Sequence, residues 1–214
     1  MTPLCANTLN TKKARSSKID FLRCFKGPRR KDAAFLFLRG YLVQRVMIVG
    51  GSGSGKSTLA RALGVRTDLP VHHMDHIHWM PDWQARPRDK RREMALEVEC
   101  GDRWIFEGGF STTYAHRISR ADTFVWLDLP VALRMWRITA RLVRYWGQER
   151  PDMAQGCTEG FHSETLSFYR WIWDTRQSGR TRILELLETA HPGLSVHHLT
   201  SRAAVHRFLD GIPC

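Results

Sequence analysis

Three absences narrow the classes of protein to which this sequence can belong. It has only five cysteines in 214 residues, spread widely along the chain and never in a Cys-x-x-Cys pair, so neither a disulfide framework nor a zinc ribbon is expected. Its longest apolar run near the start, residues 33–43, contains Arg39 and is too short to cross a bilayer. No small-residue cleavage site follows that run, as a secretory signal would require. We therefore expect a cytoplasmic protein that does not associate with a membrane.

Acidic residues are scarce in one part of the chain only. Residues 1–45 contain 11 lysines and arginines but two acids, whereas the other 22 basic residues are balanced by 19 acids. Most of the net charge of +12 therefore belongs to the first segment, which has no sustained periodicity. We expect residues 1–44 to be a basic, disordered extension without a catalytic role. Two alternatives stay open: a basic targeting or nucleic-acid-binding arm, and an upstream start codon, with translation proper beginning at Met47.

What the chain does have is a glycine-rich loop between a strand and a helix. Residues 50–57 read Gly-x-x-x-x-Gly-Lys-Ser, which is the Walker A pattern. A β-branched, apolar run at residues 46–49 precedes the loop, and good helix formers follow it. A flexible Gly/Ser linker would not lie between two such elements. The pattern therefore predicts a loop that binds a nucleoside triphosphate.

Each residue type in this loop suits phosphate binding. Glycine lets backbone N–H groups approach a polyphosphate without a Cβ in the way, and the next helix presents its positive end to the same anion. We expect Lys56 to reach the β- and γ-phosphates of ATP, and the Ser57 hydroxyl to coordinate Mg²⁺. The predicted nucleotide-binding residues are Gly50, Gly51, Ser52, Gly53, Ser54, Gly55, Lys56, Ser57 and Thr58.

Residues 45–212 alternate short apolar runs with helical segments, which predicts one α/β domain. Alternation of this kind gives a parallel sheet with helices on both faces, and 43% hydrophobic residues suffice for its core. The expected strands are residues 46–49, 69–75, 103–109, 123–128 and 194–199; the expected helices include 88–99 and 201–209.

Two carboxylates end predicted strands at the edge where parallel sheets bind ligands. Asp75 ends the second strand and is a predicted catalytic residue; Glu107 ends the third. Either carboxylate suits Mg²⁺, its water or a phosphate acceptor, and both assignments stay open. Four histidines surround Asp75, but neighbours on a strand point to opposite faces, so we expect them to line the mouth of a cleft and not to bind one metal ion. These histidines are residues 72, 73, 76 and 78.

An arginine-rich helix is predicted after Pro130. Arginines at positions 134, 137, 141 and 144 share one helix face, and no acid occurs between residues 131 and 148. Such a face would repel itself unless an anion paired with it. We therefore expect Arg137 and Arg141 to face phosphate as catalytic residues. Glycines at 147, 156 and 160 bracket a segment that can close over the cleft, so the predicted helical lid spans about residues 131–162.

Together these residues resemble the adenylate-kinase-related P-loop proteins, among them those labelled DNA topology modulation or FlaR-type proteins. The resemblance covers about residues 45–210. It implies the nucleoside monophosphate kinase fold, a three-layer P-loop NTPase fold with a five-stranded parallel sheet and an α-helical lid. Lys56, Ser57 and the lid-side arginines stand at matching positions. The segments that carry it are residues 50–58, 74–75, 102–108, 127–128 and 150–157.

The leading hypothesis is an ATP-binding P-loop kinase. It would use ATP and Mg²⁺ to transfer the γ-phosphate to a nucleotide or small-molecule acceptor. The first alternative is a nucleotide-dependent regulatory ATPase of the DNA topology modulation type, with no phosphate acceptor. The second is a nucleic-acid-binding protein that uses residues 1–45, because the rest of the chain has little excess positive charge to hold DNA.

Overall fold

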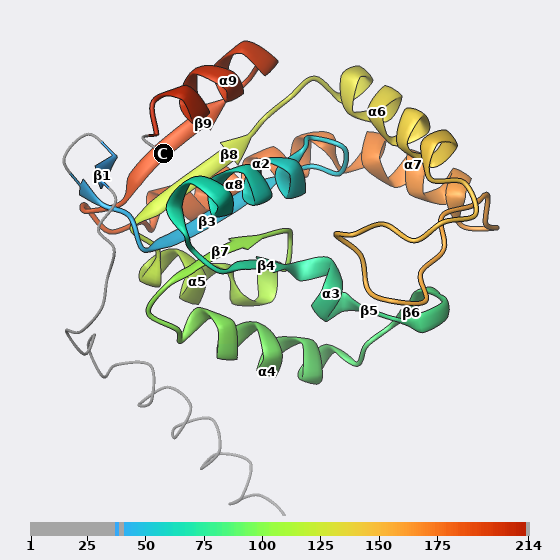
Figure 1. Ribbon diagram of the computed structural model, residues 1–214, viewed down its shortest axis with the longest axis horizontal. Coiled ribbons are helices and arrows are strands. Elements are labelled where there is room, and N and C mark those ends of the chain that lie inside the picture. Colours follow the sequence, from blue (N-terminus) through green and yellow to red (C-terminus); the bar gives the residue numbers. More distant parts are fainter. Residues whose placement is uncertain (1–36, 39–40, 213–214) are drawn as a thin grey trace, which may run out of the picture. The chain divides into compact units, whose positions relative to one another are not determined.

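The computed structural model describes residues 37–38 and 41–212, so most of the predicted N-terminal extension lies outside the described residues. Five strands form one parallel sheet in the order β4-β7-β3-β8-β9 (Figure 1). The five-stranded parallel sheet expected from the sequence is confirmed. Its strands are β3 (Arg45–Gly50), β4 (Val71–His73), β7 (Trp104–Glu107), β8 (Thr123–Leu127) and β9 (Ser195–Leu199).

Helices connect these strands, and two small antiparallel pairs lie outside the sheet. The helices are α2 (Lys56–Thr67), α3 (Met74–His78), α4 (Arg88–Glu99), α5 (Tyr114–Arg120), α6 (Val131–Arg144), α7 (Thr165–Asp174), α8 (Arg176–Glu188) and α9 (Arg202–Asp210). The small pairs are β1 (Phe37–Leu38) with β2 (Tyr41–Leu42), and β5 (Trp79–Met80) with β6 (Gln84–Ala85), joined by the 3₁₀ turn η1 (Pro81–Trp83); η2 (Ser111–Thr113) precedes α5.

The sheet is buried on both faces, which explains its continuous apolar strands. In β3, Val46 and Ile48 pack into a cluster with α2 and α9, whereas Met47 and Val49 pack into a second cluster with α4, α5 and α8. This is the period of two that places neighbouring side chains on opposite faces. The helices therefore form two layers around the central sheet, as the three-layer prediction requires. No helix in the described part of the chain has the length and apolar composition needed to span a bilayer.

The second strand is shorter than predicted, and this moves Asp75. β4 ends at His73, and the chain turns at once into the short helix α3, with Asp75 in its first turn. Met74 is buried at this turn, and a Cβ on Gly108 would lie 2.6 Å from the Met74 Cβ. The close approach of these two backbones explains the turn. Asp75 is therefore a helix residue, and His73 occupies the strand end at which the sequence placed a carboxylate.

Two residues before β3 join the domain. Val43 is buried in the cluster that contains α2. The Gln44 carbonyl accepts a hydrogen bond from Trp104 N (2.8 Å), and its N–H donates to the Asp122 carboxylate (2.9 Å). A truncation that tests the function of the extension should therefore end before Val43.

A fully buried ion pair holds the segment that follows β7. The Arg117 Nε donates to Glu99 Oε1 (2.9 Å), and its Nη1 donates to the Gly108 carbonyl (3.0 Å). Neither side chain is exposed, and the guanidinium lies 3.8 Å from the centre of the Phe106 ring. Arg117 thus ties α4 and α5 to the backbone immediately after Glu107.

Replacing Arg117 by methionine should lower the free energy of unfolding by about 3–5 kcal/mol, because it removes the guanidinium from the buried Glu99 carboxylate and leaves His116 as the side chain that contacts it. Urea denaturation of the two proteins measures this difference. The control is Arg170→Met, which breaks an exposed ion pair with Asp174 on α7 and should cost no more than about 0.5 kcal/mol. Equal losses for the two variants would contradict the prediction.

Candidate active site

The glycine-rich loop has the backbone that its sequence predicts. Gly53 and Gly55 have positive φ angles of 77° and 94°, which residues other than glycine rarely adopt. A Cβ on Gly53 would also clash with the backbone carbonyl of Arg134 in α6. The loop thus needs glycine both for its conformation and for close packing against α6.

The first turn of α2 is open to an anion. Lys56 begins the helix, no side chain caps its N-terminus, and no acid lies in its first turn. The Lys56 ammonium donates a long hydrogen bond, 3.3 Å, to the Gly51 carbonyl. The Ser54 hydroxyl is buried and has no hydrogen-bond partner within the described residues. The uncapped start of the helix and the weakly held cation both favour a phosphate group at this end of α2.

Glu107 is the carboxylate that contacts the predicted metal ligand. The Ser57 hydroxyl donates to Glu107 Oε1 (2.9 Å), and the His73 Nδ1 lies 2.6 Å from the same oxygen. Burial alone would raise the pKa of Glu107, but the hydrogen bond with His73 and the charge of Lys56 hold it below its usual range. Glu107 is therefore ionised beside Ser57 at neutral pH.

Asp75 lies close to this group. Burial raises the pKa of Asp75, and the charge of Glu107 adds to the effect; Lys56, Arg150 and Arg141 oppose it. The two carboxylates thus share Lys56 as a neighbouring cation. No described contact joins Asp75 to Ser57, so of the two acids left open by the sequence it is Glu107 that touches the Ser57 hydroxyl.

Helix α6 packs its arginines against the phosphate loop. Arg134 Nε donates to the Ser52 carbonyl (3.0 Å), and Arg137 Nη1 donates to the Ser54 carbonyl (3.1 Å). The structure therefore brings the predicted arginine face to the loop. Arg144 is an exception: it lies exposed beside the Tyr145 ring at the end of the helix.

Arg141 differs from its neighbours because no described contact joins it to a carbonyl of the loop. Its Nε is buried and has no hydrogen-bond partner within the described residues. Burial lowers its pKa, and the like charge of Arg150 lowers it further, whereas Glu159, Asp152 and Asp75 oppose this effect. The helix itself supplies no acid, as predicted, but the fold brings these three carboxylates from distant segments. Arg141 is therefore a half-buried cation with an unpartnered, buried Nε, and three carboxylates lie near enough to affect its pKa.

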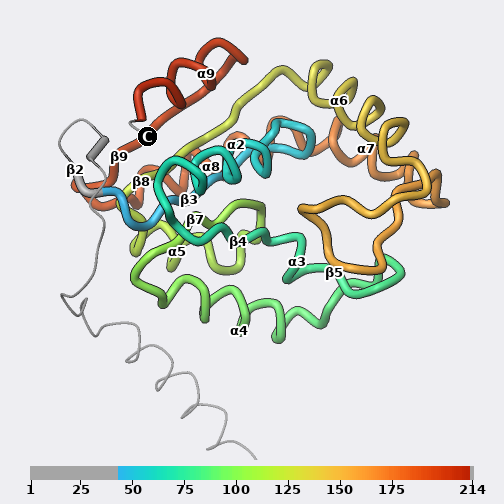
Figure 2. The backbone as a smooth tube through the Cα atoms, viewed as in Figure 1, coloured from blue at the N-terminus to red at the C-terminus, as the bar shows by residue number. Residues whose placement is uncertain are grey.

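A loop between α6 and α7 covers part of the site. It contains a β-bridge between Glu149 and Thr158, and it runs beside β5 and β6 in Figure 2. Gly147 and Gly156 have positive φ angles, 70° and 80°. A Cβ on Gly156 would lie only 2.8 Å from the Pro81 Cβ. Gly156 thus allows the loop to pack closely against Pro81, in addition to the hinge role that the sequence suggested.

Two cavities border this region. One, of about 460 Å³, lies between the β5–β6 hairpin and the loop after α6. Trp79 contributes an aromatic ring to its wall. Its lining residues are His76, Trp79, Met80, Pro81, Arg86, Met153, Ala154 and Gln155.

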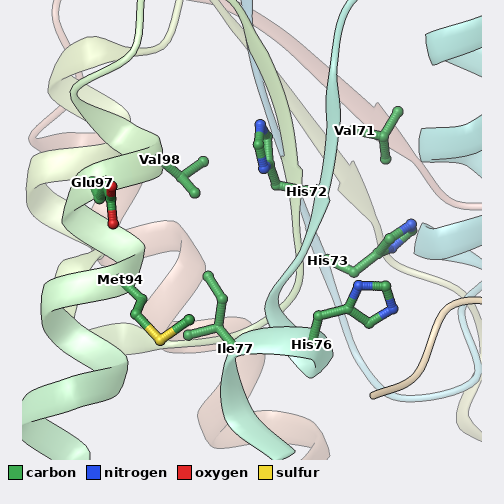
Figure 3. A pocket seen from close by; sticks show the side chains of 8 residues that line it. All are labelled: Val71, His72, His73, His76, Ile77, Met94, Glu97 and Val98. Atoms are coloured by element: carbon green, nitrogen blue, oxygen red, sulfur yellow. The ribbon is translucent and has the colours of Figure 1, made fainter. Parts of the chain in front are cut away.

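The other cavity, of about 260 Å³, lies against the edge strand β4 and α4 (Figure 3). His73 and His76 lie on one side of the chain there, with ring centres 5.2 Å apart, whereas His72 points to the other side and lies beside Phe106. Three of the four histidines, His72, His73 and His76, thus line one or both of these cavities, whereas His78 lines neither of the two. Within the described residues, no group of three or more His, Cys, Asp or Glu side chains could hold a metal ion.

Sequence reasoning missed His73 and Asp152. The sequence indicated His73 only as one of four histidines at the mouth of a cleft. In the structure it is buried and forms a hydrogen bond with Glu107. Asp152 lies in the loop after α6, and its Oδ1 is 3.3 Å from Arg61 Nη1 on α2. Its place within the Arg-Pro-Asp segment, on which the resemblance rests, was the one signal that could have pointed to it.

The similarity of this chain to known proteins is low. No protein-family model matches the chain. Over 110 residues it is 27% identical to the uncharacterized protein YqaC of Bacillus subtilis (strain 168), a match that covers 50% of this chain and 61% of that protein. The chain thus spans about three-fifths of the length of the curated relative it matches.

Among solved structures, similar chains include two kinases. One is shikimate kinase from Acinetobacter baumannii in complex with shikimate, with 18% identity and a TM-score of 0.49, covering 78% of this chain and 89% of that one. The other is deoxyadenosine kinase from M. mycoides with bound dATP, with 10% identity and a TM-score of 0.47, covering 78% and 97%. The names of these relatives say nothing of DNA topology modulation, so that part of the resemblance stays a prediction.

Proposed function

We propose that this chain is a P-loop phosphotransferase, which transfers the γ-phosphate of ATP to a nucleotide or a small-molecule acceptor. The observation that carries the proposal is Arg141, a half-buried cation whose Nε is buried without a hydrogen-bond partner among the described residues. Partial burial of a charged arginine costs free energy, which an anion would offset. A phosphoryl group in transfer spreads negative charge over its oxygens, and the planar guanidinium suits that charge.

The residues present also fit a magnesium ion. Mg²⁺ is usually held in such sites by one or two protein oxygens, several waters and the substrate phosphates. Ser57 offers a hydroxyl oxygen, and the ionised Glu107 beside it can accept hydrogen bonds from metal-bound water. The ion would neutralise charge on the β- and γ-phosphates.

The chain's own residues divide the other tasks. Lys56 and the open N–H groups of α2 would hold the β- and γ-phosphates, while Arg134 and Arg137 support the loop from outside. The loop after α6 would exclude water. Asp75, whose pKa is raised by burial, is placed to accept a proton from an acceptor hydroxyl. The acceptor would enter by the cavity between Trp79 and Met153.

The test is ADP release from ATP and Mg²⁺ in the presence of a panel of nucleoside monophosphates and small alcohols. A phosphotransferase should release ADP at least about tenfold faster with one of these acceptors than with water alone. Equal slow rates with every member of the panel would favour the regulatory ATPase. The balanced charge of residues 46–214 argues against nucleic acid as the acceptor or partner of this domain.

A further inference from the structure

Helices α6 and α7 present large apolar side chains to solvent. Two such side chains lie on each helix, and each of the four is between 48% and 70% exposed. Single exposed apolar residues are normal on a protein surface. A group of them on two neighbouring helices is not, because monomeric proteins rarely expose a large contiguous apolar area. The four residues are Trp136 and Val143 of α6, and Leu166 and Trp173 of α7.

These four side chains share one face of the helix pair. The hydroxyl groups of Thr139 and Tyr169 lie 2.8 Å apart and join α6 to α7, which run side by side (Figure 1). On each helix, one apolar residue lies three positions before the bonded residue, and another lies four positions after it. Residues at these spacings are neighbours on a helix surface. The apolar side chains therefore flank a single hydrogen bond between the two helices.

The segment between the helices adds two aromatic rings next to this face. Gly147 N donates to the Glu159 carbonyl (2.8 Å), and this bond brings the two ends of the segment together. Trp146 and Phe161 lie beside these ends and are 58% and 61% exposed. We call the whole set the α6–α7 face. It consists of Trp136, Val143, Trp146, Phe161, Leu166 and Trp173.

The area of the α6–α7 face is close to what one subunit of a dimer buries. A large side chain offers about 150–250 Å², so six that are half to two-thirds exposed present on the order of 600–800 Å². The largest apolar patch of a monomer is usually about 300–600 Å². A stable interface takes about 800 Å² from each partner. The face thus exceeds the usual patch and approaches the size of an interface.

The α6–α7 face points away from the phosphate loop. Arg134 binds the Ser52 carbonyl of that loop from α6. Trp136 follows Arg134 by two positions, so the two side chains leave the helix about 200° apart. Arg141 and Val143 are related in the same way. A partner can therefore cover the face without entering the nucleotide site.

The surface in this chain that best complements the α6–α7 face is the same face of a second copy. Among the described residues, the large exposed apolar side chains outside α6, α7 and the segment between them are Val65, Leu184 and Val196, one each on α2, α8 and β9. None of these three forms a second patch. Homodimer interfaces are more apolar than others, and tryptophan and arginine are enriched in interfaces. Arg176 lies 4.2 Å from the centre of the Trp173 ring, at the edge of the face.

We propose that two copies of this chain associate through the α6–α7 face as a two-fold symmetric dimer. In such a dimer the same surface of both copies is buried, so the contact closes on itself and leaves no apolar patch exposed. Because α6 also supports the phosphate loop through Arg134 and Arg137, the dimer would hold this helix from its outer side. The inference concerns association alone and does not depend on the proposed reaction.

The experiment measures the mass of the full chain by sedimentation equilibrium over a series of protein concentrations. Trp136→Glu places a charge on the α6 side of the face, and Leu166→Glu places one on the α7 side. The matched control is Val65→Glu, which changes an 88% exposed residue of α2. A thermal melt shows that each variant is folded, and hydrogen–deuterium exchange of the wild type follows residues 136–143 and 166–173.

We expect the wild type to be a dimer whose exchange in these two segments becomes faster on dilution. Trp136→Glu and Leu166→Glu should each raise the dissociation constant of the dimer by at least about 30-fold, the scale of a residue central to an interface, because each change occurs twice per dimer. Val65→Glu should change the dissociation constant less than about threefold, as surface substitutions usually do. Should Trp136→Glu fail to fold, Leu166→Glu supplies the same test from the other helix.

Four outcomes would overturn the inference. One is a wild type that stays monomeric at every concentration. Another is a dimer that persists in both Trp136→Glu and Leu166→Glu, because the interface would then lie elsewhere. The third is an equal loss of the dimer in Val65→Glu. The last is a monomeric wild type that binds vesicles of phosphatidylcholine and phosphatidylglycerol and loses this binding in Trp136→Glu, because the face would then serve a lipid surface.

Discussion

Replacing Arg141 by alanine is expected to lower the rate of phosphoryl transfer by about 10³-fold, the scale on which an arginine stabilises a transferring phosphoryl group. The dissociation constant of ATP should change far less, because no described contact joins Arg141 to the phosphate loop, whereas Arg137 supports the loop through the Ser54 carbonyl. Arg137→Ala should therefore weaken ATP binding as well as slow transfer. Steady-state kinetics and calorimetry of the two variants separate the effects.

Arg144→Ala is the matched control, since it removes an arginine from the exposed end of the same helix. Arg141→Lys should recover little activity, because an ammonium group cannot reproduce the planar fork of the guanidinium. Full activity in Arg141→Ala would mean that this cation does not serve the transferred group.

Replacing Lys56 by alanine is expected to lower turnover by at least about two orders of magnitude, the usual effect of removing one preorganised group from a developing charge. Lys56 begins α2 and makes a long hydrogen bond to the Gly51 carbonyl. Its removal should therefore leave the melting temperature unchanged or slightly raised. Calorimetric titration with Mg²⁺·ATP and a thermal melt provide the two measurements.

Lys90→Ala is the control for this substitution, because Lys90 lies on the exposed surface of α4 in an ion pair with Glu93. A folded Lys56→Ala protein with unchanged turnover and unchanged affinity for ATP would contradict the assignment of the phosphate loop.

Local sequence patterns predicted the fold well where one element carries its own signal. The glycine loop lies between β3 and α2 as expected, and α4 has the predicted bounds, Arg88–Glu99. Strands buried on both faces are continuous apolar runs, and these are visible without any tertiary information. The second strand was predicted too long because its end is set by the packing of Met74 against Gly108, which is a contact between distant segments.

The site was predicted less completely for the same reason. Glycines, Lys56 and Ser57 belong to one contiguous motif, whereas the partner of Ser57 is 50 residues away and no local pattern records that pairing. The arginine periodicity of α6 correctly indicated a face turned to the loop, but could not show that Arg134 and Arg137 bind its carbonyls while Arg141 lies among carboxylates. The contacts of His73 with Glu107 and of Asp152 with Arg61 likewise form only in the folded chain.

The destination of the γ-phosphate tests the central claim most directly. The protein is incubated with ATP and Mg²⁺ in water enriched in ¹⁸O, together with the acceptor panel, and the products are analysed by ³¹P NMR. Transfer to an acceptor predicts a phosphate ester without solvent ¹⁸O, formed by the wild type and lost in Arg141→Ala. If the γ-phosphate appeared only as inorganic phosphate carrying one solvent ¹⁸O, whatever acceptor is present, water would be the acceptor and the chain would be a nucleotide hydrolase.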